Sequence, residues 1–265
     1  MEYRLNAGKE IDLVSPRDIA AKLHWLKLYD RRPVYGTLVD KFDVRDYVAQ
    51  RAGPEILNAC FGEYRDPADI DLSTLPPSFI VKATHGWNMN FACPDKTQMD
   101  QRRFMRTARD WLATRHELRH AEWAYSLVKP RLIIEELIGD EELTDYKFFC
   151  FNGEPQFFKI DLGRGAIHCQ SYFTLEWDPL PFRNPRVATV AHFPNKPDEF
   201  GQMIEVARRL CADIPFVRVD LYNVASQIRF GELTLYPCGG NLHVTPPEWG
   251  DAIGDLLSLP APTPS

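Results

Sequence analysis

Asn152-Gly153 is the strongest local folding signal in this sequence, because it separates the strand-like runs DYKFFCF and EPQFFKID. An Asn-Gly pair accepts the positive φ angles of a two-residue hairpin turn, and aromatic residues dominate both flanking runs. The two runs therefore predict an antiparallel hairpin. It would lie in a second half of the chain that is richer in β structure than the first.

Other segments give helical and extended patterns. Ser15 and Pro16 are typical of the first positions of a helix, and Ile19, Leu23 and Leu26 supply its apolar stripe. The remaining predicted elements are helices over 40–53, 97–128 (two) and 198–211, and strands over 78–84, 131–138, 216–222 and 227–236.

The composition excludes several classes of protein. A chain of 265 residues with 45% hydrophobic and 26% charged residues is ordinary for one or two globular domains, and is neither disordered nor fibrous. Its net charge of −6 argues against a nucleic-acid binder. The N-terminus does not resemble a signal peptide, and no apolar window reaches ~20 residues. The six cysteines form no C-x-x-C pair. We therefore expect reduced thiols in a cytoplasmic protein without membrane insertion.

Common catalytic signatures are missing from the sequence. It contains no P-loop, no G-x-G-x-x-G fingerprint, no G-x-S-x-G elbow and no H-E-x-x-H. Nucleophilic hydrolysis and zinc-protease chemistry are accordingly disfavoured.

Lys82 lies within the apolar run FIVKAT and is followed by His85, Gly86 and Trp87. A lysine on a strand beside a loop can place a point charge on a phosphate group. The alternative is an edge-strand lysine that protects the sheet against aggregation.

Two acidic residues are predicted to meet near the C-terminus. Arg218 and Asp220 share one face of a strand, and Glu232 and Thr234 share one face of the next. A loop centred on Ser226 would place Asp220 opposite Glu232, and a loop centred one residue earlier would place them on a diagonal. Close carboxylates favour a hard divalent cation between them. The alternative is a solvated face on which these acids pair with Arg218 and Arg229.

A third feature, Glu135-Glu136, follows the apolar run LII and precedes the acidic stretch 140–142. Taken alone, it is most simply the end of a strand. Taken in order, the segments DKFDVRDYV (40–48), FIVKATHG (79–86), IIEELIGDEELTDYKFFCFNGEP (133–155) and VRVDLY with FGELTLYPCGG (217–240) resemble the ATP-grasp superfamily, and more closely its TupA-like branch.

The resemblance implies an α+β ATP-grasp fold with two lobes, a nucleotide cleft between them and a reduced N-terminal domain. The expected organisation is a short, mainly helical segment over 1–75, a small lobe over 76–138, a large lobe with the metal site over 139–260, and a flexible tail over 261–265.

The resemblance also implies roles for individual residues. Lys41 and Lys82 would contact the phosphates of ATP, with Lys147 as a further cation. Glu135, Glu136, Leu137 and Ile138 would meet adenine, and Glu142 the ribose. Asp220, Glu232 and Thr234 would hold Mg²⁺, or Mn²⁺ in its place, and Arg218 would face the acyl phosphate or substrate carboxylate. Substrate contacts are expected from Arg164, His85 and Trp87, and from the segment 162–195, which also carries His168, Tyr172, Trp177 and Arg183.

Two positions depart from the superfamily pattern. The phosphate loop, which is usually rich in glycine, reads HGWNMNF, and Thr234 replaces the common asparagine of E-x-N. The implied function is an ATP-dependent carboxylate–amine ligase that forms an amide through an acyl phosphate. Its substrate would be a sugar acid, an amino acid or a peptide-like precursor of surface polysaccharide or a metabolite. The alternatives are a small-molecule kinase and a non-catalytic nucleotide-binding module, with a glycosyltransferase less favoured. A homodimer is left open.

Overall fold

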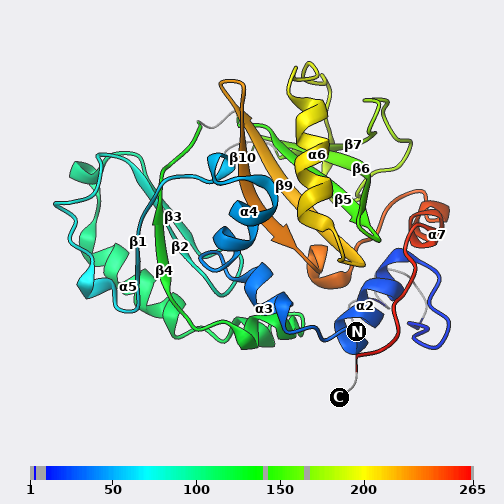
Figure 1. Cartoon of the computed structure of the whole chain (residues 1–265), viewed down its shortest axis with the longest axis horizontal. Helices are drawn as coiled ribbons and strands as arrows, with labels where there is room; N and C mark the ends of the chain where they lie inside the picture. The colour runs from blue at the N-terminus through cyan, green and yellow to red at the C-terminus, as the bar shows by residue number, and fades with distance from the viewer. Residues whose placement is uncertain (1–2, 4–9, 140–142, 164–167, 264–265) are drawn as a thin grey trace. The chain divides into compact units, whose positions relative to one another are not determined.

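The computed structural model describes residues 3, 10–139, 143–163 and 168–263 (Figure 1). The chain forms two compact units, one of residues 33–138 and one of residues 1–32 with 139–265. Residues 33–75 belong to the first of these units, and residues 1–32 belong to the other.

The unit of residues 33–138 contains a four-stranded sheet in the order β1-β4-β2-β3, and every neighbouring pair is antiparallel. Its elements are α3 (Val34–Val39), α4 (Val44–Ala52), η1 (Pro54–Ile56), β1 (Cys60–Tyr64), η2 (Pro67–Asp69), β2 (Phe79–Ala83), β3 (Asn90–Cys93), η3 (Lys96–Gln98), α5 (Gln101–Leu112), η4 (His116–Leu118), η5 (Trp123–Leu127) and β4 (Leu132–Glu135).

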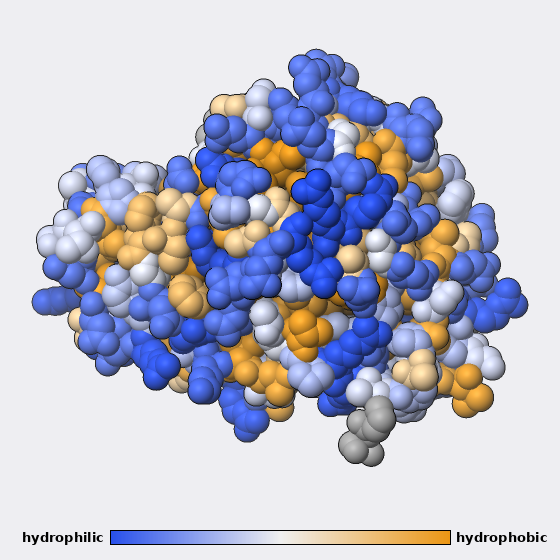
Figure 2. All heavy atoms as spheres, in the orientation of Figure 1, coloured by the Kyte–Doolittle hydropathy of each residue, from blue (hydrophilic) through white to orange (hydrophobic). Residues whose placement is uncertain are grey.

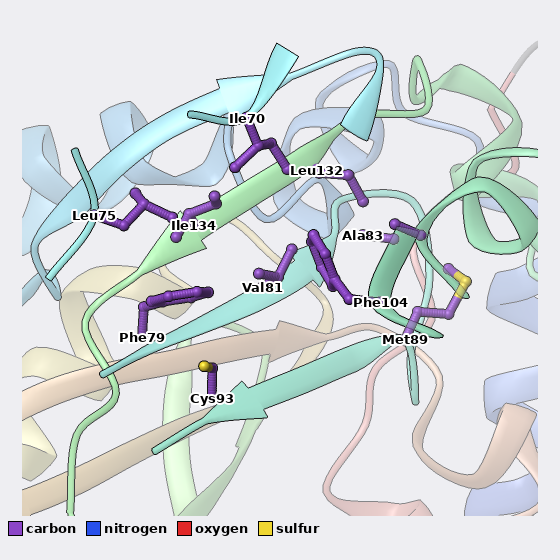
Figure 3. Packing of buried hydrophobic residues seen from close by; sticks show 11 residues of the cluster. Ile70, Leu75, Phe79, Val81, Ala83, Met89, Cys93, Phe104, Leu132 and Ile134 are labelled. Atoms are coloured by element: carbon purple, nitrogen blue, oxygen red, sulfur yellow. The ribbon is translucent and has the colours of Figure 1, made fainter. Parts of the chain in front are cut away.

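The core of this unit lies between the sheet and α5. Strand β2 alternates, with Phe79, Val81 and Ala83 fully buried, and Phe104 of α5 lies in the same cluster (Figure 3). Helix α5 begins at an Asp100 cap whose carboxylate accepts from the Arg103 N–H. Because side chains alternate along a strand, this packing leaves Lys82 on the opposite face of the sheet.

The unit of residues 1–32 and 139–265 contains a six-stranded sheet in the order β10-β9-β5-β6-β7-β8, antiparallel except for the β7–β8 pair. Its elements are α2 (Ile19–Tyr29), β5 (Asp145–Phe151), β6 (Glu154–Leu162), β7 (Cys169–Thr174), β8 (Ala188–Thr189), α6 (Phe200–Cys211), β9 (Phe216–Val224), β10 (Gln227–Thr234), η6 (Pro237–Gly240) and α7 (Glu248–Asp255).

The two faces of this sheet differ in chemistry. One face packs against α6, which lies across β5, β6 and β9 (Figure 1), and the rings of Phe148, Phe158 and Phe200 pack together there. Strand alternation sends the charged residues of the same strands, such as Lys147 and Asp220, to the other face. This second face is the part of the unit relevant to function.

Both predicted hairpins are present. Asn152 and Gly153 have φ angles of 51° and 84° and connect β5 to β6, as predicted. Ala225 and Ser226, at 50° and 61°, connect β9 to β10. A turn at this position would leave Asp220 one residue out of register with Glu232. A β-bulge between Phe230 and Glu232 restores the pairing and places them opposite each other.

Glycine is required at the bulge. A Cβ on Gly231 would lie 2.9 Å from the Tyr222 ring and 3.0 Å from the Asp220 carbonyl oxygen. The bulge therefore depends on the sequence F-G-E, and the pairing of the two acids depends on the bulge.

Several sequence expectations differ from the structure. The first helix is capped by Asp18, which accepts from the Ala21 N–H, rather than by Ser15. Only the first of the two helices expected over 97–128 forms. The second is replaced by the short turns η4 and η5, because His120 and Ala121 adopt positive φ angles that a helix excludes. Helix α3 and strand β1 were not predicted.

All six cysteines are free thiols. On the face shown in Figure 2, hydrophilic residues predominate and hydrophobic residues are interspersed among them. Among the residues described, no helix has both the length and the apolar character needed to cross a bilayer.

Candidate active site

An ion triad lies on the four-stranded sheet, on the face opposite α5. The carboxylate of Glu135 accepts from Lys82 Nζ at 2.8 Å and from Arg45 Nη1 at 2.6 Å. Strand β2 is hydrogen-bonded to both β3 and β4, so Lys82 is not an edge-strand lysine. The Lys82 side chain is thus held on a central strand and is partly exposed to solvent, and the buried carboxylate of Glu135 balances its charge.

The loop between β2 and β3 is held by side chains from elsewhere in its unit. Lys41 Nζ donates to the Gly86 carbonyl, and the Trp87 indole N–H donates to Glu122 at 3.1 Å. His116 Nε2 accepts from the Trp87 backbone N–H at 3.3 Å, and burial lowers the pKa of His116 to about 4, so that its ring is neutral at pH 7. His85, also buried, lies 3.1 Å from the Trp111 carbonyl oxygen through Nε2. The loop is therefore ordered without being rich in glycine.

The charged face of the six-stranded sheet brings together four predicted site residues. Arg218 donates to both oxygens of Asp220, at 2.7 Å each. The same guanidinium reaches Glu232 at 2.9 Å and the Thr234 hydroxyl at 3.0 Å. The alternative in which these acids pair with Arg218 is therefore met. The face is only partly solvated, because Asp220 is 1% exposed whereas the Glu232 side chain is 42% exposed.

Lys147 of β5 joins this group from the neighbouring strand. Its ammonium lies 2.6 Å from Asp220 and 2.5 Å from Asp145. Burial by itself would raise the pKa of Asp220, but the charges of Arg218 and Lys147 outweigh it and lower this pKa to about 2. Asp220 is therefore ionised throughout the physiological range.

The oxygen ligands expected for a metal ion converge on one point. In the described ranges no three His, Cys, Asp or Glu side chains are placed to hold a metal. Two carboxylates and one hydroxyl, from Asp220, Glu232 and Thr234, do surround a single cationic group, the Arg218 guanidinium. Hard divalent cations prefer oxygen ligands of these types, so the chemistry of the donor set suits Mg²⁺ or Mn²⁺. In this structure the Arg218 guanidinium occupies the centre of the three ligands.

Other predicted site residues are more dispersed. The Glu136 N–H donates to the Ala59 carbonyl, and Leu137 and Ile138 are partly exposed beyond β4. Glu142 and Arg164 lie outside the described residues. In the segment 162–195, Tyr172 and Trp177 pack among aromatic rings. The backbone of Arg183 pairs with that of Thr245. The side chain of His168 is half exposed.

The structure adds residues that the sequence reasoning missed. Asp145 contacts Lys147, Arg45 contacts Glu135, and His116 and Glu122 hold the β2–β3 loop. Lys159 and Asp161 of β6 also lie on the charged face. The K-I-D spacing of this last pair was the available signal, since residues two apart share one face of a strand.

Comparisons with known proteins agree with this architecture. The sequence profile described as TupA-like ATPgrasp matches residues 21–258. A search of curated protein sequences found no match. Similar solved structures include L-amino acid ligase from Bacillus licheniformis, at 12% identity and a TM-score of 0.50, with 84% of this chain and 50% of that one covered.

D-alanine–D-alanine ligase from Bacillus anthracis is also similar, at 15% identity and a TM-score of 0.47, over 83% of this chain and 63% of the ligase. The chain thus spans about half to two thirds of the length of these ligases. At such identities the likeness concerns the fold, which is the α+β ATP-grasp fold expected from the sequence. Because the profile match covers most of the chain on this fold, the protein belongs to the TupA-like ATP-grasp family.

Proposed function

We propose that this protein is an ATP- and Mg²⁺-dependent carboxylate–amine ligase. The observation that carries the proposal is the convergence of Arg218, Asp220, Glu232 and Thr234, with Lys147 beside them, on one face of a sheet. Phosphoryl transfer needs mainly positioning and neutralisation of charge, and this group supplies both. The similar fold of an L-amino acid ligase supports the same reaction class.

The ion triad suggests roles for residues of the unit formed by residues 33–138. We assign Lys82 to the phosphates of ATP, with Glu135 and Arg45 fixing its position. Lys41 would exchange the Gly86 carbonyl for a phosphate oxygen. Because the Glu136 N–H is already bonded to Ala59, adenine would meet the backbone of Leu137 and Ile138.

Mg²⁺, or Mn²⁺ in its place, would be held by Asp220, Glu232 and Thr234. A bound divalent ion supplies neutralisation of the negative charge that builds up on the phosphates. Arg218, displaced from these oxygens, would then face the carboxylate substrate with its planar pair of donors. Lys147 would stay on Asp220 and keep that carboxylate ionised.

The proposed reaction has two steps. A carboxylate oxygen of the first substrate attacks the γ-phosphorus of ATP, the bond to the bridging oxygen breaks, and ADP leaves. The neutral amine of the second substrate then attacks the acyl carbon, inorganic phosphate leaves, and the nitrogen loses its proton to give the amide. Exclusion of water protects the acyl phosphate between these steps. The carboxylate substrate is expected to be a sugar acid, an amino acid or a peptide-like precursor.

The test is ADP release by the purified full chain, measured with pairs drawn from a panel of carboxylates and amines, together with isothermal titration of ATP and MgCl₂. We expect ADP and free phosphate to form only when both substrates are present. Lys82→Ala and Glu232→Ala should remove this activity, whereas Lys129→Ala, at an exposed lysine, should not. Failure to bind ATP would overturn the proposal, and transfer of phosphate to a hydroxyl would identify a kinase instead.

A further inference from the structure

The charged face of the six-stranded sheet continues beyond Lys147 into a second polar group, formed by Lys159, Asp161, Gln170 and His168. Lys159 pairs in register with Lys147, and Asp161 pairs with Gln170 on the next strand. The ammonium of Lys147 lies 3.8 Å from an Asp161 oxygen, which makes the two groups neighbours. None of these four residues has a role in the proposed phosphate chemistry.

The second group is buried to an unusual degree for its polarity. The side chains of Lys159 and Asp161 are 12% and 7% exposed, and Gln170 is 2% exposed. Lys159 Nζ lies 3.1 Å from Asp161 Oδ2 and donates to Gln170 Oε1 at 2.9 Å. Burying such groups is costly unless their hydrogen bonds are satisfied.

Two atoms of this group are not satisfied by the protein. Neither the Gln170 amide nitrogen nor Asp161 Oδ1 makes a hydrogen bond, although both are shielded from solvent. A buried donor or acceptor without a hydrogen-bond partner destabilises the folded protein. The His168 ring, half exposed, lies 3.4 Å from Asp161 Oδ1 through Nε2 and borders the group. A donor and an acceptor, on two residues that pair across β6 and β7, therefore lack protein partners.

The chemistry of these leftover atoms indicates what they bind. The Gln170 amide and the Lys159 ammonium are donors suited to a carboxylate, and Asp161 Oδ1 is an acceptor suited to an ammonium group. A simple anion would be repelled by Asp161, and a simple amine would be repelled by Lys159. A molecule that carries an ammonium group and a carboxylate group on the same carbon would satisfy all three side chains.

We propose that Lys159, Asp161, Gln170 and His168 form the subsite for the amine substrate, and that this substrate is a free α-amino acid bound as its zwitterion. The inference rests on the proposed ligase function and narrows it. The subsite lies beside Lys147 and Arg218, where the acyl phosphate would form. The bound ammonium group would give one proton to Asp161, and the resulting neutral amine would then attack the adjacent acyl carbon.

The test compares each of the twenty standard amino acids with two derivatives, the amino acid amide and the N-acetyl amino acid. Binding to the full chain is followed by thermal shift and by isothermal titration in the presence of ADP and MgCl₂. We expect at least one free amino acid to bind and to support ADP release, while its two derivatives do neither. Equal binding of the amide or the acetylated form would overturn the inference.

Variants separate this subsite from the phosphate site. Gln170→Leu keeps the volume and leaves the ion pair in place, and should weaken amino-acid binding by about 10- to 100-fold, as expected for one hydrogen bond to a charged group. Lys159→Met should do the same or more, whereas Lys129→Met, the same change at an exposed position, should not. Affinity for ATP should stay unchanged in all three.

The outcomes are distinguishable. Unchanged amino-acid affinity in Gln170→Leu and Lys159→Met overturns the subsite. If wild-type protein binds ATP and ligates only amines that lack a carboxylate, the inference fails while the ligase proposal stands. If wild-type protein does not bind ATP, the ligase proposal itself fails.

Discussion

Lys147 is expected to be the residue on which the charged sheet face depends most for stability. Its ammonium is shared by Asp145 and Asp220, at 2.5 Å and 2.6 Å, and all three side chains are buried. Replacing Lys147 with methionine keeps most of the side-chain volume and removes the charge. Asp220 would then keep its contacts with Arg218, whereas Asp145 would lose the ammonium that lies 2.5 Å away.

The magnitude follows from the burial. Removing one partner of a buried ion pair costs ~3–5 kcal/mol, because an uncompensated charge stays behind. For a chain of this size each kcal/mol lowers Tm by ~2–4 °C, so the variant should melt ~6–20 °C below the wild type. Thermal unfolding at pH 7 measures the loss of stability. Hydrogen exchange of the β5 and β9 amides shows whether the loss affects the unit that contains the six-stranded sheet.

The pH dependence provides a second readout. Asp220 has a folded pKa of about 2, below the usual value of 3.8, so its contribution to stability is complete above about pH 4 and is lost as the pH falls through 2. The shift corresponds to roughly 2 kcal/mol in the wild type. Without Lys147 the pKa of Asp220 in the folded protein should rise, and the loss of stability between pH 4 and pH 2 should become smaller.

The matched control is Arg208→Met. Arg208 pairs with Glu154 at 2.8 Å and also with Glu205, but all three side chains are exposed, so the change should cost less than ~1 kcal/mol. Adding Asp220→Asn to Lys147→Met should recover part of the lost stability, since one of the uncompensated charges is gone. If Lys147→Met were as mild as the control, and the double variant recovered nothing, the reasoning would be refuted.

Two further predictions concern the β2–β3 loop. A Cβ on Gly86 would overlap the fully buried His116 ring and lie 2.5 Å from Met89 Cε, so Gly86→Ala should cost ~1–3 kcal/mol in urea unfolding. Gly201→Ala, where no atom lies within 4 Å, should be neutral or stabilising, and equal effects of the two changes would contradict this account. The pKa of His116 is about 4 in the folded protein and 6.5 in the unfolded chain, so between these pH values only the unfolded chain binds a proton at this ring. The free energy of unfolding should therefore fall as the pH drops from 6.5 to 4. Urea unfolding across this range should show a shallower dependence for His116→Gln, and an unchanged slope would argue against a buried neutral ring.

Local sequence patterns predicted much of the fold. Asn152-Gly153 specified its hairpin because only a few residues accept two successive positive φ angles. The period-two pattern placed Arg218 with Asp220, and Glu232 with Thr234, because strand alternation depends only on neighbours along the chain. The helix over 198–211 was anticipated for the same local reason, and α6 spans Phe200–Cys211.

Long-range pairing decided the rest. The bulge at Gly231 sets Asp220 opposite Glu232, and its position depends on contacts with Tyr222 across the strands. The carboxylate of Glu135 contacts Lys82 and Arg45, residues 53 and 90 positions away in the sequence, and no local pattern predicts these contacts.

The sequence by itself thus determined which residue types alternate, which turns form, and the family to which the chain belongs. The tertiary structure alone decided which charges meet. Lys147, Asp161 and Lys159 become neighbours only when β5 and β6 pair in one register, and Gln170 joins them only through β7. Electrostatic energy falls with distance in space rather than along the chain, so the balance of these buried charges could not be worked out from the sequence alone.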